Sequence, residues 1–85
     1  MSVNDWELTR IERTILAVLE CRAEDVSGRE LRSLVRRAGY HRSAPAFVFT
    51  MLRMADKGLV VCREEARVVE GLEFKEWYYR LPPWA

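Results

Sequence analysis

The stretch Ser43–Val60, SAPAFVFTMLRMADKGLV, decides the fold, because it contains a helix start, an apolar stripe and a helix stop in succession. Ser43 can cap the helix, and Pro45 is tolerated in a first turn, where backbone N–H groups have no intrahelical partner. Apolar side chains then recur at spacings of four and three, which places them along one helix face: Phe47, Met51 and Met54. Gly58 is the expected residue after the helix, and the β-prone run Leu59–Val61 follows it. The stretch therefore predicts a helix that passes directly into a strand.

A second helix is predicted just before this stretch. Ser27 and Glu30 fit a capping box, in which each side chain binds the other residue's backbone N–H. The apolar stripe that follows contains Leu31, Leu34 and Val35, and Gly39 is the expected stop. Only the short segment 39–42 separates this helix from Ser43. Two helices joined by so few residues must cross steeply, so we expect a helix-turn-helix arrangement.

The N-terminal segment 4–22 predicts a first helix, because apolar residues recur there at helical spacing: Leu8, Ile11, Ile15, Leu16 and Leu19. Two capping boxes compete for its start: Asn4 with Glu7, and Thr9 with Glu12. We favour the longer helix from Asn4, since nothing between the two boxes breaks a helix. The alternative start at Thr9 would leave residues 1–8 as an N-terminal arm that carries Trp6.

The C-terminal third of the chain predicts a β-hairpin. The candidate strands are Leu59–Val69 and Glu73–Leu81, with Glu70-Gly71 as the turn between them. Alternation in the second strand places Trp77, Tyr79 and Leu81 on one face, which we expect to meet the core. Pro82-Pro83 cannot donate to a ladder, so residues 82–85 are expected to form a tail. Upstream, Val26 is a candidate for a short extended bridge.

These elements predict an α+β fold, with three helices followed by a two-stranded hairpin, in a single domain over residues 1–85. We expect one core with these members: Leu16, Leu19, Leu31, Leu34, Phe47, Met51, Leu59, Tyr79 and Leu81.

The element order resembles a winged helix-turn-helix, and three short strings resemble PadR- and MarR-type bacterial transcriptional regulators. The strings are Leu8-Thr9-x-x-Glu12-x-x-Ile15-Leu16-x-x-Leu19, Met51-x-x-Met54-x-x-Lys57-Gly58-Leu59-Val60 and Tyr78-Tyr79-Arg80-Leu81. The resemblance implies that the helix after Ser43 is a recognition helix and that the hairpin is a wing. It covers nearly the whole chain but mainly reports core packing. Since winged helices also serve as protein-binding modules, the fold alone does not fix the function.

Charge is distributed unevenly along the chain, although its formal net charge is only +1. Between Arg29 and Arg42, five arginines against one glutamate give a local charge of +4, so the remaining residues balance to −3. Such an asymmetry suits a surface that neutralises phosphates, and a helix N-terminus at Ser43 also favours an anion. We therefore expect duplex DNA as the partner, contacted through Arg36, Arg37, His41, Arg42, Ser43, Thr50, Arg53 and Arg67.

The helix after Ser43 also predicts an alternative function. Its residues outside the core stripe are mostly apolar, whereas a helix that reads base edges needs hydrogen-bonding side chains. Phe49 lies about 200° round the helix from Phe47 and so points away from the core. The alternative is a protein-interaction module, forming a homodimer or binding a partner chain through Trp6, Phe49 and Leu52.

Other function classes find little support in the sequence. The chain has a single histidine and lacks a nucleophile with a neighbouring base, a Gly-rich phosphate loop and metal-ligand spacing, so we expect no enzyme activity, cofactor, metal or small-molecule substrate. Cys21 and Cys62 show no CxxC spacing, which favours two reduced thiols and a cytoplasmic location. The sequence also lacks a membrane-length apolar run and a signal-peptide core, so no membrane partner is expected.

Overall fold

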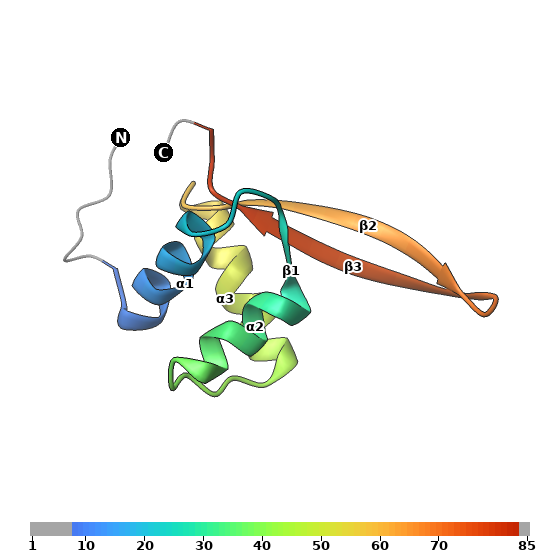
Figure 1. The fold of residues 1–85 in the computed structure, drawn as a ribbon, viewed down its shortest axis with the longest axis horizontal. Coiled ribbons are helices and arrows are strands. Elements are labelled where there is room, and N and C mark those ends of the chain that lie inside the picture. Colours follow the sequence, from blue (N-terminus) through green and yellow to red (C-terminus); the bar gives the residue numbers. More distant parts are fainter. Residues whose placement is uncertain (1–7, 84–85) are drawn as a thin grey trace.

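The computed structural model describes residues 8–83, which form an α+β fold of three helices and a three-stranded antiparallel sheet (Figure 1). The elements are α1 (Arg10–Glu20), β1 (Val26–Ser27), α2 (Gly28–Arg37), α3 (Ala44–Asp56), β2 (Val61–Val69) and β3 (Leu72–Arg80). The α+β class and the order of the helices before the hairpin are thus confirmed. The expectations for Trp6 and for most of the N-terminal arm lie outside the described residues. None of the helices in the described range is long and apolar enough to cross a membrane.

The sheet has strand order β1-β3-β2, so it contains one strand more than the two-stranded hairpin expected from the sequence. The extra strand is the bridge expected at Val26, which pairs with Tyr79, while Ser27 pairs with Tyr78. The chain leads straight from this bridge into α2. Gly28 allows the close approach, because a Cβ at this position would lie 3.3 Å from Cε2 of Tyr79. The third strand therefore fixes the start of α2 against the base of the hairpin.

The hairpin pairs nine residues of β2 with nine of β3, from Val61 opposite Arg80 to Val69 opposite Leu72. Its turn is at Glu70 and Gly71, as expected, and both residues have positive φ angles, 52° and 78°. Two central residues with positive φ are the requirement of a type I′ turn, whose twist matches that of the strands.

Both helices of the predicted helix-turn-helix begin and end at the expected residues, although at Ser27 the described bonds include only one half of the expected capping box. The hydroxyl oxygens of Ser27 and Ser43 accept the backbone N–H groups of Glu30 and Ala46, at 3.2 Å and 3.3 Å. The stops at Gly39 and Gly58 have φ angles of 102° and 77°. Each is followed by an N–H that bonds back into the helix: Tyr40 to the Val35 oxygen at 3.2 Å, and Leu59 to the Met54 oxygen at 2.9 Å. This closure uses Leu59, which explains why β2 begins at Val61 rather than at Leu59.

The prediction of a longer first helix that begins at Asn4 is wrong. The structure begins α1 at Arg10, after an extended Thr9 with φ −74° and ψ 164°. The Thr9 hydroxyl oxygen accepts the Glu12 N–H at 3.2 Å, and Oε1 of Glu12 accepts the Thr9 N–H at 2.9 Å. Oε2 of Glu12 also accepts a hydrogen bond from Nζ of Lys57 at 3.0 Å. A contact with the end of α3, 45 residues away, thus supports the second capping box, and the local sequence does not show it.

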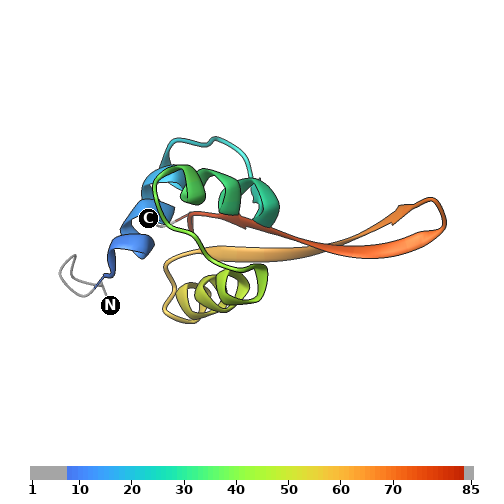
Figure 2. The same cartoon turned by 90° about the horizontal axis from the view of Figure 1, so that it is seen from below.

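The core lies where the helices meet the base of the hairpin, with α3 on one side of that base and α1 and α2 on the other (Figure 2). Its buried members are Ile11, Ile15, Leu19, Val26, Leu31, Val35, Phe47, Met51, Met54, Val60 and Tyr79. Of the expected core residues, Leu16, Leu59 and Leu81 are partly buried against this cluster, as is Trp77. Leu34 is half-exposed and lies outside the cluster, since Val35, one residue further round α2, takes the buried position.

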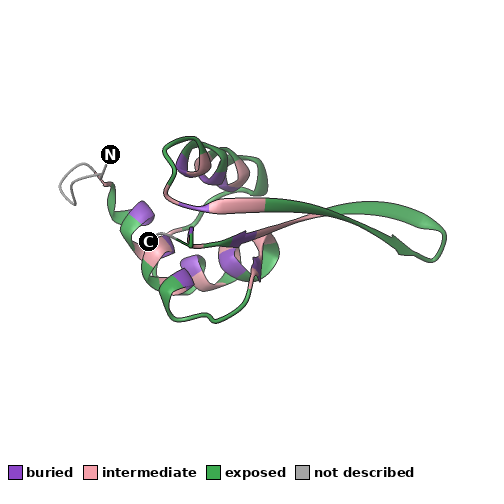
Figure 3. Ribbon diagram, turned by 90° about the horizontal axis from the view of Figure 1, so that it is seen from above, coloured by how far each residue is buried: buried purple, intermediate pink, exposed green. Residues whose placement is uncertain are grey.

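Beyond this base the hairpin projects away from the helices, and residues 63–75 are all exposed (Figure 3). We call these residues the projecting hairpin. It includes four large apolar side chains with exposed fractions between 47% and 73%: Val68, Val69, Leu72 and Phe74.

Candidate nucleic-acid interface

Three arginines lie along the outer side of α2, because spacings of three and four residues place side chains on one helix face: Arg29, Arg32 and Arg36. Two of them also hold the turn to α3. Nε of Arg32 donates to the backbone oxygen of Arg42 at 2.9 Å, and Nε of Arg36 donates to Nδ1 of His41 at 3.3 Å. This bond occupies Nδ1 of His41 and leaves Nε2 for a further partner. Arg32 and Arg36 thus order the turn through their Nε atoms.

The N-terminus of α3 lies directly after this turn. Arg42 and Ser43 are both exposed there, and the Ser43 hydroxyl oxygen already caps the helix through Ala46. Helix N-termini carry a partial positive charge from their unpaired N–H groups. Arg42 therefore adds a full charge to a position where the backbone already favours an anion.

The outer face of α3 is apolar at its centre and charged at its end. Phe49 and Leu52 have exposed fractions of 64% and 45%, and Arg53 and Asp56 are exposed further along. Thr50 is half-buried, and its hydroxyl donates to the backbone oxygen of Ala46 at 3.0 Å. The hydroxyl proton of Thr50 is therefore used within the helix, which leaves Arg53 as the main hydrogen-bond donor on this face.

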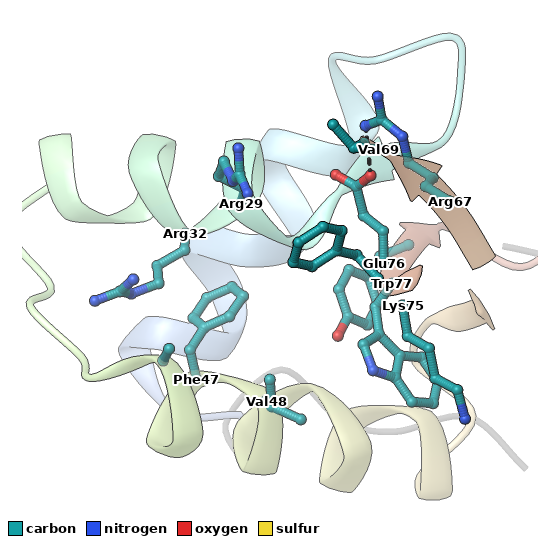
Figure 4. A pocket seen from close by; sticks show the side chains of 13 residues that line it. Arg29, Arg32, Phe47, Val48, Arg67, Val69, Lys75, Glu76 and Trp77 are labelled. Atoms are coloured by element: carbon teal, nitrogen blue, oxygen red, sulfur yellow. Dashed lines mark hydrogen bonds and ion pairs between the residues drawn. The ribbon is translucent and has the colours of Figure 1, made fainter. Parts of the chain in front are cut away.

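An open groove of about 570 Å³ separates α2 and α3 from the hairpin (Figure 4). Arg29 and Arg32 reach it from α2, and Phe47 and Val48 line it from α3. The hairpin contributes Arg67, Val69, Phe74, Lys75, Glu76, Trp77 and Tyr79. The groove thus combines an apolar, aromatic lining with cations from both sides.

The cations of the hairpin are paired with carboxylates. Arg67 contacts Glu76 at 2.9 Å, Lys75 contacts Glu64 at 3.7 Å, and Arg80 contacts Asp25 at 3.9 Å. Arg63 pairs with Glu65 and with Asp25, and its guanidinium carbon lies 4.7 Å from the centre of the Tyr78 ring. The hydrogen bond from Arg67 lowers the pKa of Glu76, and the same bond raises the pKa of Arg67. The charges of the hairpin therefore largely neutralise one another.

The arginines between α2 and the end of α3 differ in this respect. Within residues 8–83 no carboxylate lies within 4.0 Å of any of the following: Arg29, Arg32, Arg36, Arg37, Arg42 and Arg53. We call these six the unpaired arginines. Glu30, the acid of α2, is instead 3.9 Å from Arg22. Of the basic residues of this part of the chain, only Lys57, which binds Glu12, has an ion-pair partner within the described residues.

The structure brings together most of the residues proposed from the sequence for DNA contact. Arg36, His41, Arg42 and Ser43 surround the turn, with Arg37 beside them on α2. Arg53 lies further along α3, while Arg67 lies apart on the projecting hairpin. Sequence reasoning did not select Arg29 and Arg32 individually, although their helical spacing from Arg36 was a signal that could have identified them.

Comparison of the sequence with models of known protein families and with curated proteins finds no match.

Proposed function

We propose that the chain is a winged-helix domain that binds duplex DNA and acts as a cytoplasmic transcriptional regulator. In this proposal α3 is the recognition helix, and the turn before it contacts the phosphate backbone. The arrangement of α2, a short turn and α3, followed by a hairpin, supports the fold. The absence of a match to known families leaves the resemblance to PadR- and MarR-type regulators as part of the proposal.

The observation that supports DNA binding most directly is the set of unpaired arginines. An arginine already paired with a carboxylate must lose that partner before it can neutralise a phosphate. An unpaired arginine can neutralise a phosphate directly and so release the counterions condensed on the DNA. All six lie in α2, the turn or α3, and Arg42 directly precedes the N-terminus of α3. By the same reasoning we leave Arg67 out of the primary interface, because its guanidinium is held by Glu76.

The proposed binding depends mainly on phosphate contacts. Base reading in the major groove requires exposed donors and acceptors, and the outer face of α3 offers Arg53 with the apolar Phe49 and Leu52. Phosphate contacts fix position without reading sequence. We therefore expect modest sequence preference and strong salt dependence.

The test is the fluorescence anisotropy of a labelled random duplex, titrated with the protein at several salt concentrations. Replacing Arg36 and Arg37 by alanine should reduce the slope of log affinity against log salt by about two. The matched control replaces Arg67 and Lys75 by alanine, which removes the same charge from paired positions and should change the slope little. If the wild-type protein does not bind a duplex at low salt, the proposal is wrong.

A second candidate function rests on the exposure of Phe49 and Leu52. An aromatic and a leucine side by side on a helix, flanked by Arg53, have the composition of a protein interface. On this alternative, α3 anchors a homodimer or a partner chain, and DNA is not bound. Replacing Phe49 by serine distinguishes the two. Loss of a dimer in sedimentation with unchanged duplex affinity would support the partner surface, whereas loss of duplex affinity by a monomer would place this face on DNA.

A further inference from the structure

The outer edge of β2 is open to a further strand. In the strand order β1-β3-β2, one side of β2 pairs with β3, and no strand of residues 8–83 pairs with the other side. Figure 1 shows that the hairpin extends beyond the helices, so they do not cover this edge along the projecting hairpin. An open edge presents unpaired backbone N–H and C=O groups, which form a template for pairing with another chain.

A second copy of the chain can pair with this edge only in certain registers. Symmetric antiparallel pairing places a two-fold axis perpendicular to the sheet, and each copy then keeps its side chains on the same face. Because side chains alternate along a strand, residues pair only with residues of the same face. Each allowed register therefore has one residue of β2 on the axis, opposite itself.

The charges of β2 favour one of these registers. With Ala66 on the axis, Glu65 of each copy lies opposite Arg67 of the other, and a small side chain occupies the axis. The neighbouring registers bring like charges together. An axis at Glu64 or Arg67 places that charged residue opposite itself, and an axis at Glu65 places Arg63 opposite Arg67. Opposite charges across strands stabilise a pair, and like charges destabilise it.

A like-charge pair inside the hairpin gives this register a further advantage. Glu65 lies directly opposite Glu76 in the β2–β3 ladder. Arg67 contacts Glu76, and Arg63 contacts Glu65, so each acid has a cation on its own chain. Pairing at Ala66 would add the second copy's Arg67 on the open side of Glu65, which further offsets the repulsion between the two acids.

The same register covers part of the apolar surface of the projecting hairpin. Val69, with an exposed fraction of 47%, would lie opposite Arg63, whose aliphatic stem can cover it. Val68, the most exposed of the four large apolar residues, would lie opposite the stem of Glu64.

We propose that two copies of this chain pair through the outer edges of β2, antiparallel and centred on Ala66, to form a continuous six-stranded sheet. This interface is distinct from the α3 face of Phe49 and Leu52. It is also independent of DNA binding, because the unpaired arginines lie on other elements.

The test uses charge reversal and sedimentation equilibrium over a wide range of protein concentration. The wild-type protein should form a dimer, and Glu65→Arg or Arg67→Glu should each weaken it at least tenfold, because each creates two like-charge contacts. An equimolar mixture of the two variants should restore the dimer, since the guanidinium introduced at position 65 of one chain then faces the carboxylate introduced at position 67 of the other. The matched control is Glu20→Arg on α1, which makes the same charge change away from the sheet and should leave the dimer intact.

Two further measurements keep the proposal open to refutation. Far-UV circular dichroism checks that each variant is folded. Ala66→Arg is a second variant that should disrupt the dimer, because it places two cations opposite each other on the axis. A monomeric wild-type protein would mean that the charges of β2 protect the edge from pairing, and the proposal would be wrong. It would also be wrong if Phe49→Ser dissociates the dimer while both charge reversals leave it unchanged, because the interface would then be on α3.

Discussion

In the helical body, Phe47, Met51 and Met54 are buried, and the arginines of α2 have no carboxylate partner among residues 8–83. In the projecting hairpin, by contrast, Val68 and Phe74 are exposed, and every cation has a carboxylate partner. The difference follows from the number of layers. Two layers of side chains meet in the body, so apolar contacts can hold it and its charges remain available. The projecting hairpin has no second layer to pack against within the described residues, and cross-strand ion pairs reinforce it instead.

This comparison shows why the net charge of +1 is a poor guide to function. The cations of the hairpin lie beside carboxylates, so these charges cancel locally. The unpaired arginines of α2, the turn and α3, by contrast, have no carboxylate within 4.0 Å among residues 8–83. What matters for a polyanionic partner is where the unpaired cations lie.

The largest expected effect is on stability, because we expect apolar packing to stabilise the helical body but not the projecting hairpin. Met51→Ala should lower the free energy of unfolding by ~2–4 kcal/mol, because Met51 is fully buried and its loss leaves a cavity. Phe74→Ala should change it by only about 0.5 kcal/mol or less, since the ring is half-exposed. Urea unfolding followed by circular dichroism measures both. Equal losses for the two variants would show that the hairpin is packed against something in solution.

Glu12 is a charged group buried in the helical body. Burial raises the pKa of Glu12, but the hydrogen bonds from the Thr9 N–H and from Lys57 outweigh it, and the net effect lowers the pKa below 4.5. A lowered pKa in the folded state adds stability that is complete above 4.5 and is lost as the pH falls through the folded value. We therefore expect wild-type protein to lose stability more steeply than Glu12→Gln between about pH 5 and 3.

Lys57 provides the control for the Glu12 prediction. Lys57→Ala should destabilise the protein by about 1–2 kcal/mol at neutral pH, because it leaves the carboxylate of Glu12 buried without its cation. Solvent screens this ion pair, since the Lys57 side chain is 39% exposed, which keeps the loss small. Parallel pH profiles for wild-type and Glu12→Gln proteins would contradict the role given to this ion pair.

A smaller effect is expected for a single unpaired arginine. Arg42→Ala should weaken binding to all duplexes to a similar extent and reduce the log–log salt slope by about one, as the loss of one phosphate contact predicts. Arg80→Ala, which removes a cation paired with Asp25, is the matched control. A sequence-dependent loss on Arg42→Ala would instead indicate contact with base edges.

The smallest expected effect comes from removing the carboxylate partner of one cation of the hairpin, which would leave that cation unpaired like the arginines of the body. Glu76→Gln removes the carboxylate that holds Arg67, so Arg67 becomes available to phosphate and duplex affinity should rise about two- to fivefold. Glu73→Gln changes the net charge equally in the same strand without releasing Arg67. If the two variants bind duplexes equally, only total charge matters, and ion pairing does not explain the difference between the two regions.

The sequence predicted the features that depend on a few neighbouring residues. Ser27 and Ser43 mark the helix starts, Gly39 and Gly58 the stops, and Glu70-Gly71 the hairpin turn, because each needs only a local side chain or a positive φ angle. The face of α3 was also predictable from helical spacing, which correctly placed Phe47 inside and Phe49 outside.

The errors concern contacts between distant parts of the chain. The capping of α1 by Thr9 and Glu12 is supported by Lys57, and the sheet has three strands because Val26 pairs with Tyr79. In the candidate interface, the sequence located the positive charge but could not show which arginines remain unpaired. That distinction depends on cross-strand neighbours such as Arg67 and Glu76, which are adjacent only in the folded hairpin.

The ion pair between Glu12 and Lys57 also has a mechanical consequence. It joins the first turn of α1 to the C-cap residue of α3, so the two helix ends are held together at one point. If α3 tilts on binding a DNA groove or a partner, either α1 rotates together with it as a rigid unit or the Glu12–Lys57 ion pair breaks. We therefore expect the pivot of any such motion to lie at Lys57, and the largest displacement at the opposite end of α3, beside Arg42 and Ser43.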